Sequence, residues 1–145
     1  MPSKPTSERL HILLAEDNPG DAFLVREALT TRLPGIEISI REDGEQMMRW
    51  IDLLDNGEAR VPDVILLDLN LPRITGEEVL WKLRHSPVCR DVPIVVVTSS
   101  DSPRDRAATA RLGVIRYFRK PMDYDEFMKL GDLVSAVLAS RESAS

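Results

Sequence analysis

The sequence lacks most features that mark a secreted or membrane protein. Cys89 is its only cysteine, so no intramolecular disulfide can form and nothing indicates an oxidising compartment. No apolar run approaches the ~20 residues needed to span a bilayer. The segment Met1–Leu10 has neither the apolar stretch nor the cleavage pattern of a signal peptide. We therefore expect a cytoplasmic protein without a membrane partner.

An excess of positive charge is also missing. The chain has 19 Lys and Arg against 24 Asp and Glu, a formal net charge of −5. Nucleic-acid-binding domains usually carry a basic face, so we expect no nucleic acid partner. With 43% hydrophobic and 30% charged residues, the composition is that of an ordinary globular domain. Polar ends rich in small residues predict one domain over residues 10–139, with flexible tails at 1–9 and 140–145.

Short apolar runs rich in β-branched residues alternate with stretches of helical period, a pattern typical of βαβ units. Three runs are almost continuously apolar, as strands buried on both faces are: His11–Ala15, Asp63–Asp68 and Pro93–Thr98. Ile36–Arg41 alternates and Ile115–Phe118 is short, which predicts two edge strands. The expected fold class is α/β: a doubly wound, flavodoxin-like (βα)5 fold. Its five-stranded parallel sheet has the order 2-1-3-4-5, with helices on both faces.

The last two predicted helices differ in their apolar content. The fourth, roughly residues 104–112, has few large apolar residues and ends at Gly113, so we expect the weakest packing there. The fifth has a longer apolar stripe and is preceded by Asp123, a suitable N-cap.

Polar residues follow four of the five predicted strands. They are Glu16 and Asp17, Asp68, Thr98, and Lys120. The carboxyl ends of parallel strands meet at one edge, where ligands bind in such sheets. Three carboxylates crowded together repel one another unless a cation or protons are present. Mg²⁺ suits this site, because it prefers carboxylate and carbonyl oxygens, and the Asn70 backbone carbonyl could add one ligand.

A carboxylate beside such a cation can attack a phosphoryl donor and form an acyl phosphate. Asp68 would be this nucleophile, with the Lys120 ammonium and the Thr98 hydroxyl stabilising phosphoryl oxygens. Each residue alone also has a structural explanation: Glu16 or Asp17 could cap a helix that starts at Pro19, and the others could belong to turns. Their meeting at one edge favours a site.

The motifs resemble those of the receiver domains of two-component response regulators. They are Ile12-Leu13-Leu14-Ala15-Glu16-Asp17-Asn18, Leu66-Leu67-Asp68-Leu69-Asn70-Leu71-Pro72, Val97-Thr98-Ser99 and Tyr117-Phe118-Arg119-Lys120-Pro121. The resemblance covers about Leu10 to Leu138. It implies transfer of a phosphoryl group to Asp68 from a sensor histidine kinase or a phosphotransfer protein.

The resemblance also implies roles for the neighbouring residues. Glu16, Asp17, Asp68 and the Asn70 carbonyl would bind Mg²⁺, with Mn²⁺ as an alternative, and Thr98 and Lys120 would contact the phosphoryl group. Tyr117 is the aromatic position of the switch, together with Thr98, and the Lys120–Pro121 bond is usually cis. The segment Glu16–Asp21 is similar to that of small regulators paired with bacteriophytochromes.

We expect phosphorylation to act through the surface of the fourth helix, fifth strand and fifth helix. Thr98 would move toward the phosphoryl group and Tyr117 would turn into the vacated space. Several arginines lie on this side: Arg104, Arg106, Arg111, Arg116 and Arg119. They could form a partner or homodimer surface, or equally a solvated charged face.

The leading hypothesis is thus a stand-alone phosphoacceptor switch that catalyses its own phosphorylation and dephosphorylation but is not a conventional enzyme. One alternative is a pseudo-receiver, a binding module that works without phosphate; the complete set Asp68, Thr98 and Lys120 argues against it. Another is a phosphatase of the haloacid-dehalogenase type. Those enzymes place Asp-x-Asp after the first strand, whereas Asp68-Leu69-Asn70 follows the third.

Overall fold

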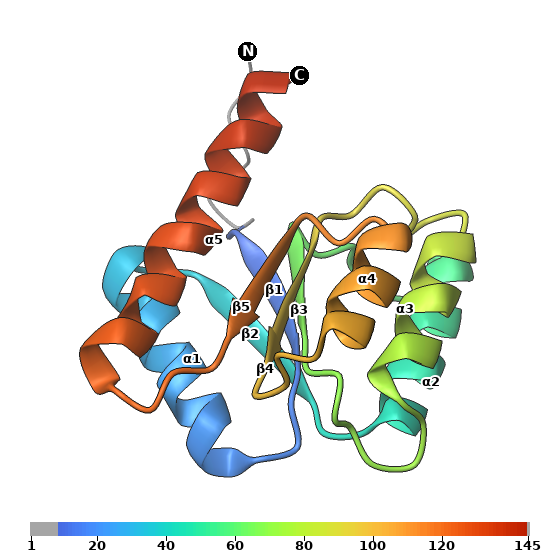
Figure 1. Ribbon diagram of the computed structural model, residues 1–145. Coiled ribbons are helices and arrows are strands. Elements are labelled where there is room, and N and C mark those ends of the chain that lie inside the picture. The colour runs from blue at the N-terminus through green and yellow to red at the C-terminus, as the bar shows by residue number, and fades with distance from the viewer. Residues whose placement is uncertain (1–8, 145) are drawn as a thin grey trace.

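The computed structural model describes residues 9–144, with side chains through residue 141 (Figure 1). The tail expected at residues 1–9 lies outside this part of the chain except for Arg9. Within the described part, no helix has the length and apolar composition needed to cross a membrane.

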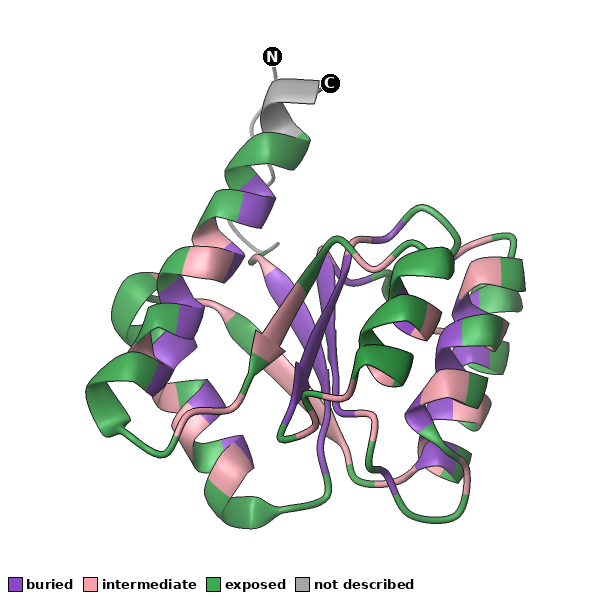
Figure 2. Ribbon diagram, in the orientation of Figure 1, coloured by how far each residue is buried: buried purple, intermediate pink, exposed green. Residues whose placement is uncertain are grey.

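Five parallel strands form one sheet in the order β2-β1-β3-β4-β5, as predicted. They are β1 His11–Ala15, β2 Glu37–Arg41, β3 Val64–Leu67, β4 Ile94–Thr98 and β5 Arg116–Arg119. The three continuously apolar runs became the interior strands. The alternating run and the short run became the two edges. Burial follows the same division, because β1, β3 and β4 are buried throughout whereas β2 and β5 are partly exposed (Figure 2).

Helices cover both faces of the sheet (Figure 1). They are α1 Pro19–Arg32, α2 Gly44–Asp55, α3 Gly76–His85, α4 Pro103–Arg111 and α5 Tyr124–Ala144. Successive residues of a strand point to opposite faces. Ile12 and Leu14 of β1 therefore join the core beneath α1 and α5, while Leu13 and Ala15 join the core beneath α2 and α3. This double covering explains why the interior strands are continuously apolar.

The α1–α5 contact is unusually close at Gly131, near the middle of α5. A Cβ atom at this position would lie 2.3 Å from the carbonyl oxygen of Ala28 on α1. Leu130 and Val134, on either side of Gly131, are buried in the same core. Glycine is therefore the residue that allows the two helix backbones to meet here.

The last helix, α5, extends into the segment that the sequence analysis assigned to a tail. We expected a tail from residue 140, but the helix continues to Ala144. Polarity suggested a tail, yet the segment contains neither Gly nor Pro to stop a helix, and Ala, Arg and Glu favour one. Arg141 also donates a hydrogen bond of 2.6 Å to the Asp63 carbonyl. At the other end, Asp123 caps the helix as predicted, accepting a bond from the Glu126 N–H.

The weak packing expected of α4 is confirmed, since Thr109 is its only buried residue. Its carboxyl end is nevertheless anchored by Arg84 of α3. The guanidinium donates hydrogen bonds of 2.8 Å to the carbonyls of Leu112 and Gly113, and others to the carbonyls of Arg90 and Val92. Burial lowers the pKa of Arg84. The opposite end of α4 has no comparable anchor among the described residues.

Candidate functional site

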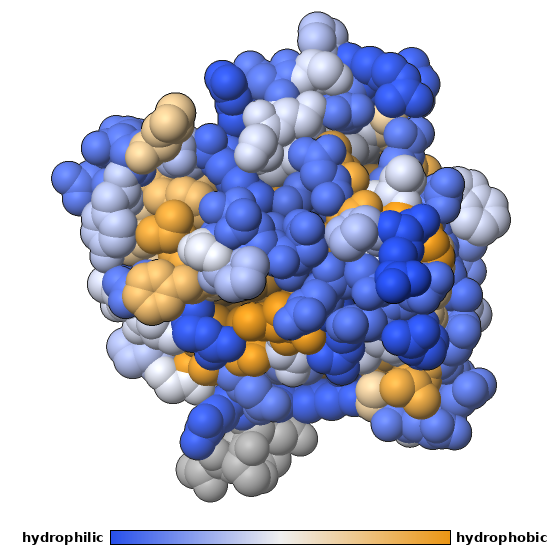
Figure 3. Space-filling view, turned by 90° about the horizontal axis from the view of Figure 1, so that it is seen from below, coloured by the Kyte–Doolittle hydropathy of each residue, from blue (hydrophilic) through white to orange (hydrophobic). Residues whose placement is uncertain are grey.

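The strands run toward the bottom of Figure 1, so their carboxyl ends form the lower edge of the sheet. Figure 3 looks onto this edge, whose surface is mostly hydrophilic with separate hydrophobic patches. The residues predicted from the sequence meet here: Glu16 after β1, Asp68 after β3, Thr98 at the end of β4 and Lys120 after β5. Glu16, Asp68 and Thr98 are buried. The carboxyl edge therefore contains a polar site that is partly shielded from solvent.

The Lys120 ammonium lies at the centre of this site. Its Nζ atom is 2.8 Å from Asp68 Oδ2, 2.8 Å from Glu16 Oε1 and 2.8 Å from Asp21 Oδ2. Only 7% of the lysine side chain is exposed. Burial alone would lower the pKa of Lys120, but Asp21, Asp68 and Glu16 together raise it. Lys120 therefore carries a proton throughout the physiological pH range.

Glu16 retains an oxygen for which the protein supplies no good hydrogen bond. Oε2 accepts a bond of 3.2 Å from the Asn18 N–H. Oε1 is buried and, within the described residues, forms the ion pair with Lys120 but no hydrogen bond of acceptable geometry. Burial, opposed by Lys120 and reinforced by the charge of Asp68, raises the pKa of Glu16 to about 7. An additional positive charge near Oε1 would give this oxygen a partner and would stabilise the ionised carboxylate.

Three carboxylates are arranged to hold a cation. Glu16, Asp17 and Asp68 each offer one oxygen, and these oxygens lie within 4.8 Å of one another. Asp17 is exposed, which leaves a side open to solvent. All-oxygen ligands, one open side and the unsatisfied Glu16 oxygen fit a hard divalent ion such as Mg²⁺. Asn70 lies in the adjacent loop, where its N–H donates a bond of 3.0 Å to Asp68 Oδ1; its carbonyl remains a predicted ligand.

The local structure shows that the acidic pair does not cap α1. The N-cap is Asn18, whose side chain accepts a hydrogen bond of 2.9 Å from the Asp21 N–H, and Pro19 occupies the first turn. Capping was the structural explanation that the sequence left open for Glu16 and Asp17. Helix capping therefore does not account for either carboxylate.

The backbone that carries Asp68 is fixed by the start of α3. A Cβ atom at Gly76 would lie 2.5 Å from Leu69 Cα and 2.7 Å from the Asp68 carbonyl oxygen. The Gly76 N–H donates a hydrogen bond of 3.1 Å to the Leu69 carbonyl. Only a residue without a side chain lets the helix approach the loop so closely. The packing holds Asp68 in place without using its carboxylate.

Thr98 is connected to Tyr117 through a single residue. Thr98 Oγ1 lies 3.4 Å from Asn70 Nδ2 and 3.4 Å from the Ser100 amide nitrogen, which both donate to it. The Tyr117 hydroxyl donates a bond of 2.8 Å to the Ser100 carbonyl. The two predicted switch residues are thus held by the two sides of Ser100.

Arg106 of α4 covers the Tyr117 ring and belongs to a group of charged residues around it in the chain. The Arg106 guanidinium lies over the ring, 4.2 Å from its centroid. Asp101 pairs with Arg106 at 2.7 Å and with Arg119 at 3.6 Å. Arg104 pairs with acidic residues as well. Most of the predicted arginine set is therefore engaged in ion pairs within the chain and does not form a uniform basic face.

One expectation about the backbone is wrong. The structure has no cis peptide bond among the described residues, so Lys120–Pro121 is trans. For an isolated X–Pro bond the trans form is favoured by roughly 0.5–1 kcal/mol. The Lys120 side chain reaches its three partners with the bond in this form.

The sequence analysis missed Asp21 as a partner of Lys120. Asp21 lies in the first turn of α1, just beyond the acidic pair. A carboxylate one turn into a helix that starts at the carboxyl edge of the sheet is a signal that could have identified it. It is also an ordinary acidic residue for a helix N-terminus, which made it inconspicuous.

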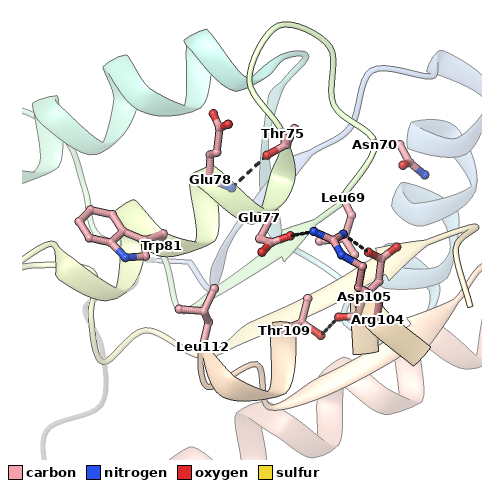
Figure 4. Close-up of a pocket in the computed structure, with 10 residues that line it drawn as sticks. All are labelled: Leu69, Asn70, Thr75, Glu77, Glu78, Trp81, Arg104, Asp105, Thr109 and Leu112. Carbon is pink, nitrogen blue, oxygen red and sulfur yellow. Dashed lines mark hydrogen bonds and ion pairs between the residues drawn. The ribbon is translucent and has the colours of Figure 1, made fainter. Parts of the chain in front are cut away.

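A groove between α3 and α4 opens beside the site (Figure 4). Trp81 lies at one end, and Arg104, with its ion partners Glu77 and Asp105, lies at the other. The groove reaches the loop after Asp68 through Leu69 and Asn70. None of the three clustered carboxylates lines the groove, which adjoins the candidate metal site through Asn70.

Comparison with known families gives a match that covers most of the chain. The response regulator receiver domain matches residues 12–131. This range includes every residue of the site described above, from Glu16 to Lys120.

Individual proteins agree with this match. Response regulator Rcp1 of Synechocystis is 36% identical over 120 residues, which cover 82% of both chains. The crystal structure of the phosphorylated cyanobacterial phytochrome response regulator RcpA has a TM-score of 0.83 at 30% identity, covering 92% of this chain and 96% of that one. The Mn²⁺-bound form of Rcp1 has a TM-score of 0.77 at 34% identity, covering 87% and 91%.

Proposed function

The chain belongs to the response regulator receiver domain family, and on this premise we propose that it accepts a phosphoryl group on Asp68 from a sensor histidine kinase or a phosphotransfer protein. The observation that carries the proposal is the 2.8 Å contact between Lys120 Nζ and Asp68 Oδ2, beside three carboxylate oxygens within 4.8 Å of one another. A nucleophile, a fixed positive charge and a cation site thus meet at one point.

In the proposed reaction, a carboxylate oxygen of Asp68 attacks phosphorus in line with the leaving group. The bond from phosphorus to the donor breaks, its electron pair leaves with the donor atom, and an acyl phosphate remains on Asp68. Glu16, Asp17, Asp68 and the Asn70 carbonyl would hold Mg²⁺ or Mn²⁺, which supplies charge neutralisation to the phosphoryl oxygens. Lys120 and the Thr98 hydroxyl donate hydrogen bonds to those oxygens.

The phosphoryl group leaves when water attacks phosphorus and the bond to the Asp68 oxygen breaks. Inorganic phosphate departs and the carboxylate is restored. The same donors stabilise both steps, so the protein catalyses its own phosphorylation and dephosphorylation without being a conventional enzyme. The haloacid-dehalogenase alternative is not supported, because Asp68 follows β3 and Asn70 takes the place of the second aspartate.

The proposed signal passes from Thr98 through Ser100 to Tyr117. A phosphoryl oxygen that takes the Thr98 hydroxyl would disturb its contact with the Ser100 amide. The Ser100 carbonyl, to which Tyr117 is bonded, would move with it. Tyr117 would then change position and alter the α4-β5-α5 surface, where a target or a second copy of the chain would bind.

A phytochrome-like kinase is the proposed partner. Support comes from RcpA, a phytochrome response regulator by name, which shares 30% identity with this chain over nearly its whole length. Labelling of the protein by different purified sensor kinases, measured as initial rates, would test this choice.

Acetyl phosphate tests the reaction itself without a kinase. Incubation with acetyl phosphate and Mg²⁺ should add one phosphoryl mass to the intact protein. The label should be lost in Asp68→Asn and in excess EDTA. Asp91→Asn is a matched control because the side chain of Asp91 is 94% exposed and remote from the site. No labelling of the wild type, or labelling that survives Asp68→Asn, would refute the proposal.

A further inference from the structure

We infer that Asp21 is a positioning residue that orients the Lys120 ammonium for phosphoryl transfer. The inference rests on the proposed function and extends it to a residue outside the family motifs that identified the site. It is motivated by the third ion pair of Lys120, which connects the first turn of α1 to the residue after β5.

The three partners of Lys120 are not equivalent. Three carboxylate oxygens each lie 2.8 Å from Nζ, but only those of Asp21 and Asp68 accept hydrogen bonds from the ammonium within the described residues, and Glu16 forms an ion pair alone. Glu16 and Asp68 also belong to the carboxylate group that can hold a cation, whereas Asp21 does not. With a cation bound, oxygens of Glu16 and Asp68 would be shared with that cation and with the incoming phosphoryl group. Asp21 is the partner that is free to keep its contact with Lys120.

A lysine needs such a contact because its stem is long and flexible. Fixing a Lys side chain costs roughly 1.5–2 kcal/mol of conformational entropy. An ion pair that persists through the reaction holds one N–H direction constant. The other two N–H groups are then directed toward the place where the phosphoryl oxygens arrive, without a search at the moment of reaction.

Asp21 is itself firmly held. Its N–H is bonded to the Asn18 side chain at 2.9 Å, so it belongs to the capped first turn of α1. Its side chain is 31% exposed and contacts Lys120 from the α1 side of the site. The anchor therefore lies on a helix, not on a mobile loop, which is a suitable support for a residue that must fix another.

Two substitutions separate the charge of Asp21 from its presence. Asp21→Asn keeps an acceptor oxygen for Lys120 but removes the negative charge, whereas Asp21→Ala removes both. The maximal rate of Asp68 labelling at saturating acetyl phosphate and Mg²⁺ should fall roughly tenfold in Asp21→Ala, less than the loss of a direct donor would cause. Asp21→Asn should recover part of this loss.

Saturation kinetics distinguish positioning from a general charge effect. Removing a negative charge near the site favours a negatively charged donor, which changes the half-saturating concentration of acetyl phosphate. Loss of positioning instead lowers the maximal rate. Asp91→Ala and Asp91→Asn, on an exposed carboxylate, are the matched controls and should leave both parameters unchanged.

A double-mutant cycle tests whether Asp21 acts through Lys120. In a Lys120→Met background, Asp21→Ala should cause no further loss of rate. An additional tenfold loss in that background would overturn the inference, because Asp21 would then act by another route.

The Lys120 ammonium itself provides a readout that needs no phosphoryl transfer. In the wild type its ¹H–¹⁵N NMR signal should be visible, because buried and bonded ammonium protons exchange slowly. It should broaden in Asp21→Ala and persist in Asp91→Ala. A wild type that is labelled, with an unchanged maximal rate or an unchanged signal in Asp21→Ala, overturns this inference alone. Failure of the wild type to be labelled would overturn the proposed function, and the positioning role with it.

Discussion

The carboxyl edge of the sheet has two halves that are built differently. In one half, Glu16 and Asp68 are buried and converge on the Lys120 ammonium, so charges on three segments of the chain are tied to one point. In the other half, Thr98 is buried, but Tyr117 is only half-buried and is covered by Arg106 of the loosely packed α4. One half is held by buried ion pairs, and the other by a few hydrogen bonds, a cation–π contact and exposed ion pairs.

This difference matches the demands of the two tasks that we propose. Phosphoryl transfer needs groups held in a constant geometry, because misplaced donors lose most of their stabilising effect. The structural response to phosphorylation needs an element whose two arrangements differ little in free energy. Such elements belong to the less stable parts of a fold. The four predictions below test the comparison, from the largest expected effect to the smallest.

Removal of the Lys120 ammonium should strongly reduce phosphorylation of Asp68. Lys120→Met leaves Glu16, Asp21 and Asp68 without their shared positive charge. The rate of labelling by acetyl phosphate and Mg²⁺ should fall by at least about 100-fold, the usual effect of losing one stabilising donor. Lys129→Met is the control, because Lys129 is exposed on α5 and pairs with Glu126 on the same helix. Equal rates in the two variants would contradict the role of Lys120.

Removal of the α4 anchor should destabilise the protein. Arg84→Met leaves the carbonyls of Leu112 and Gly113 without their donor, and we expect a loss of about 2 kcal/mol in the free energy of unfolding. Urea denaturation monitored by circular dichroism measures this. Arg90→Met, at an exposed arginine, should change stability by less than ~0.5 kcal/mol. Equal effects would mean that α4 is not anchored by Arg84.

Removal of the Arg106 guanidinium from the Tyr117 ring should make the ring more mobile with little loss of protein stability. Arg106→Ala deletes a cation–π contact worth roughly 0.5–1 kcal/mol at an exposed site. The ring signals of Tyr117 in ¹H–¹³C NMR should then broaden or shift as the ring explores other positions. Arg116→Ala changes an arginine whose guanidinium donates a hydrogen bond to the Ile115 carbonyl, and should leave the ring signals in place. Identical spectra of the two variants would show that Arg106 does not restrain the ring.

The smallest effect concerns His11, which lies at the amino end of β1, away from the carboxyl edge. Burial lowers the pKa of His11 from its ordinary value of 6.5, and its Nε2 lies 2.9 Å from the Ser39 hydroxyl. The His11 imidazole therefore binds a proton less readily in the folded protein than in the unfolded chain. Between pH 6.5 and the lower folded pKa, the unfolded state binds more protons, so stability falls as the pH falls.

His11→Gln should flatten this part of the stability curve. His85→Gln alters the chain's other histidine, which is exposed, and should leave the curve unchanged. Urea denaturation at several pH values below 6.5 compares the two. A curve that stays as steep in His11→Gln as in the wild type would place the acid response elsewhere, including the carboxylate site.

The sequence predicted the sheet well because the pattern of each strand reflects its surroundings. Continuous apolar runs gave the three interior strands, and the alternation of Ile36–Arg41 gave an edge. The site residues followed, since each lies at the end of a strand or directly after one. Asp21 and Arg84 were missed because they act through contacts distant in the chain, 99 residues away for Asp21 and up to 29 for Arg84. Local pattern contains no information on which distant group a flexible side chain will meet.

The end of α5 was missed for a different reason. A polar, small-residue composition describes both a tail and the exposed last turns of a helix. The absence of Gly and Pro was the better guide, since helix propensity continues until a residue interrupts it.

Gly131 offers a way to reach the site without altering any of its charges. It sets the separation of α1 and α5, and both helices begin at the carboxyl edge, close to Asp21 and Lys120 respectively. Ala28, which it touches, is seven residues beyond Asp21, or about 10 Å along the helix. A methyl group added at position 131 would act as a wedge between the helices. The size of the residue at position 131 could therefore be used to adjust the distance between Asp21 and Lys120.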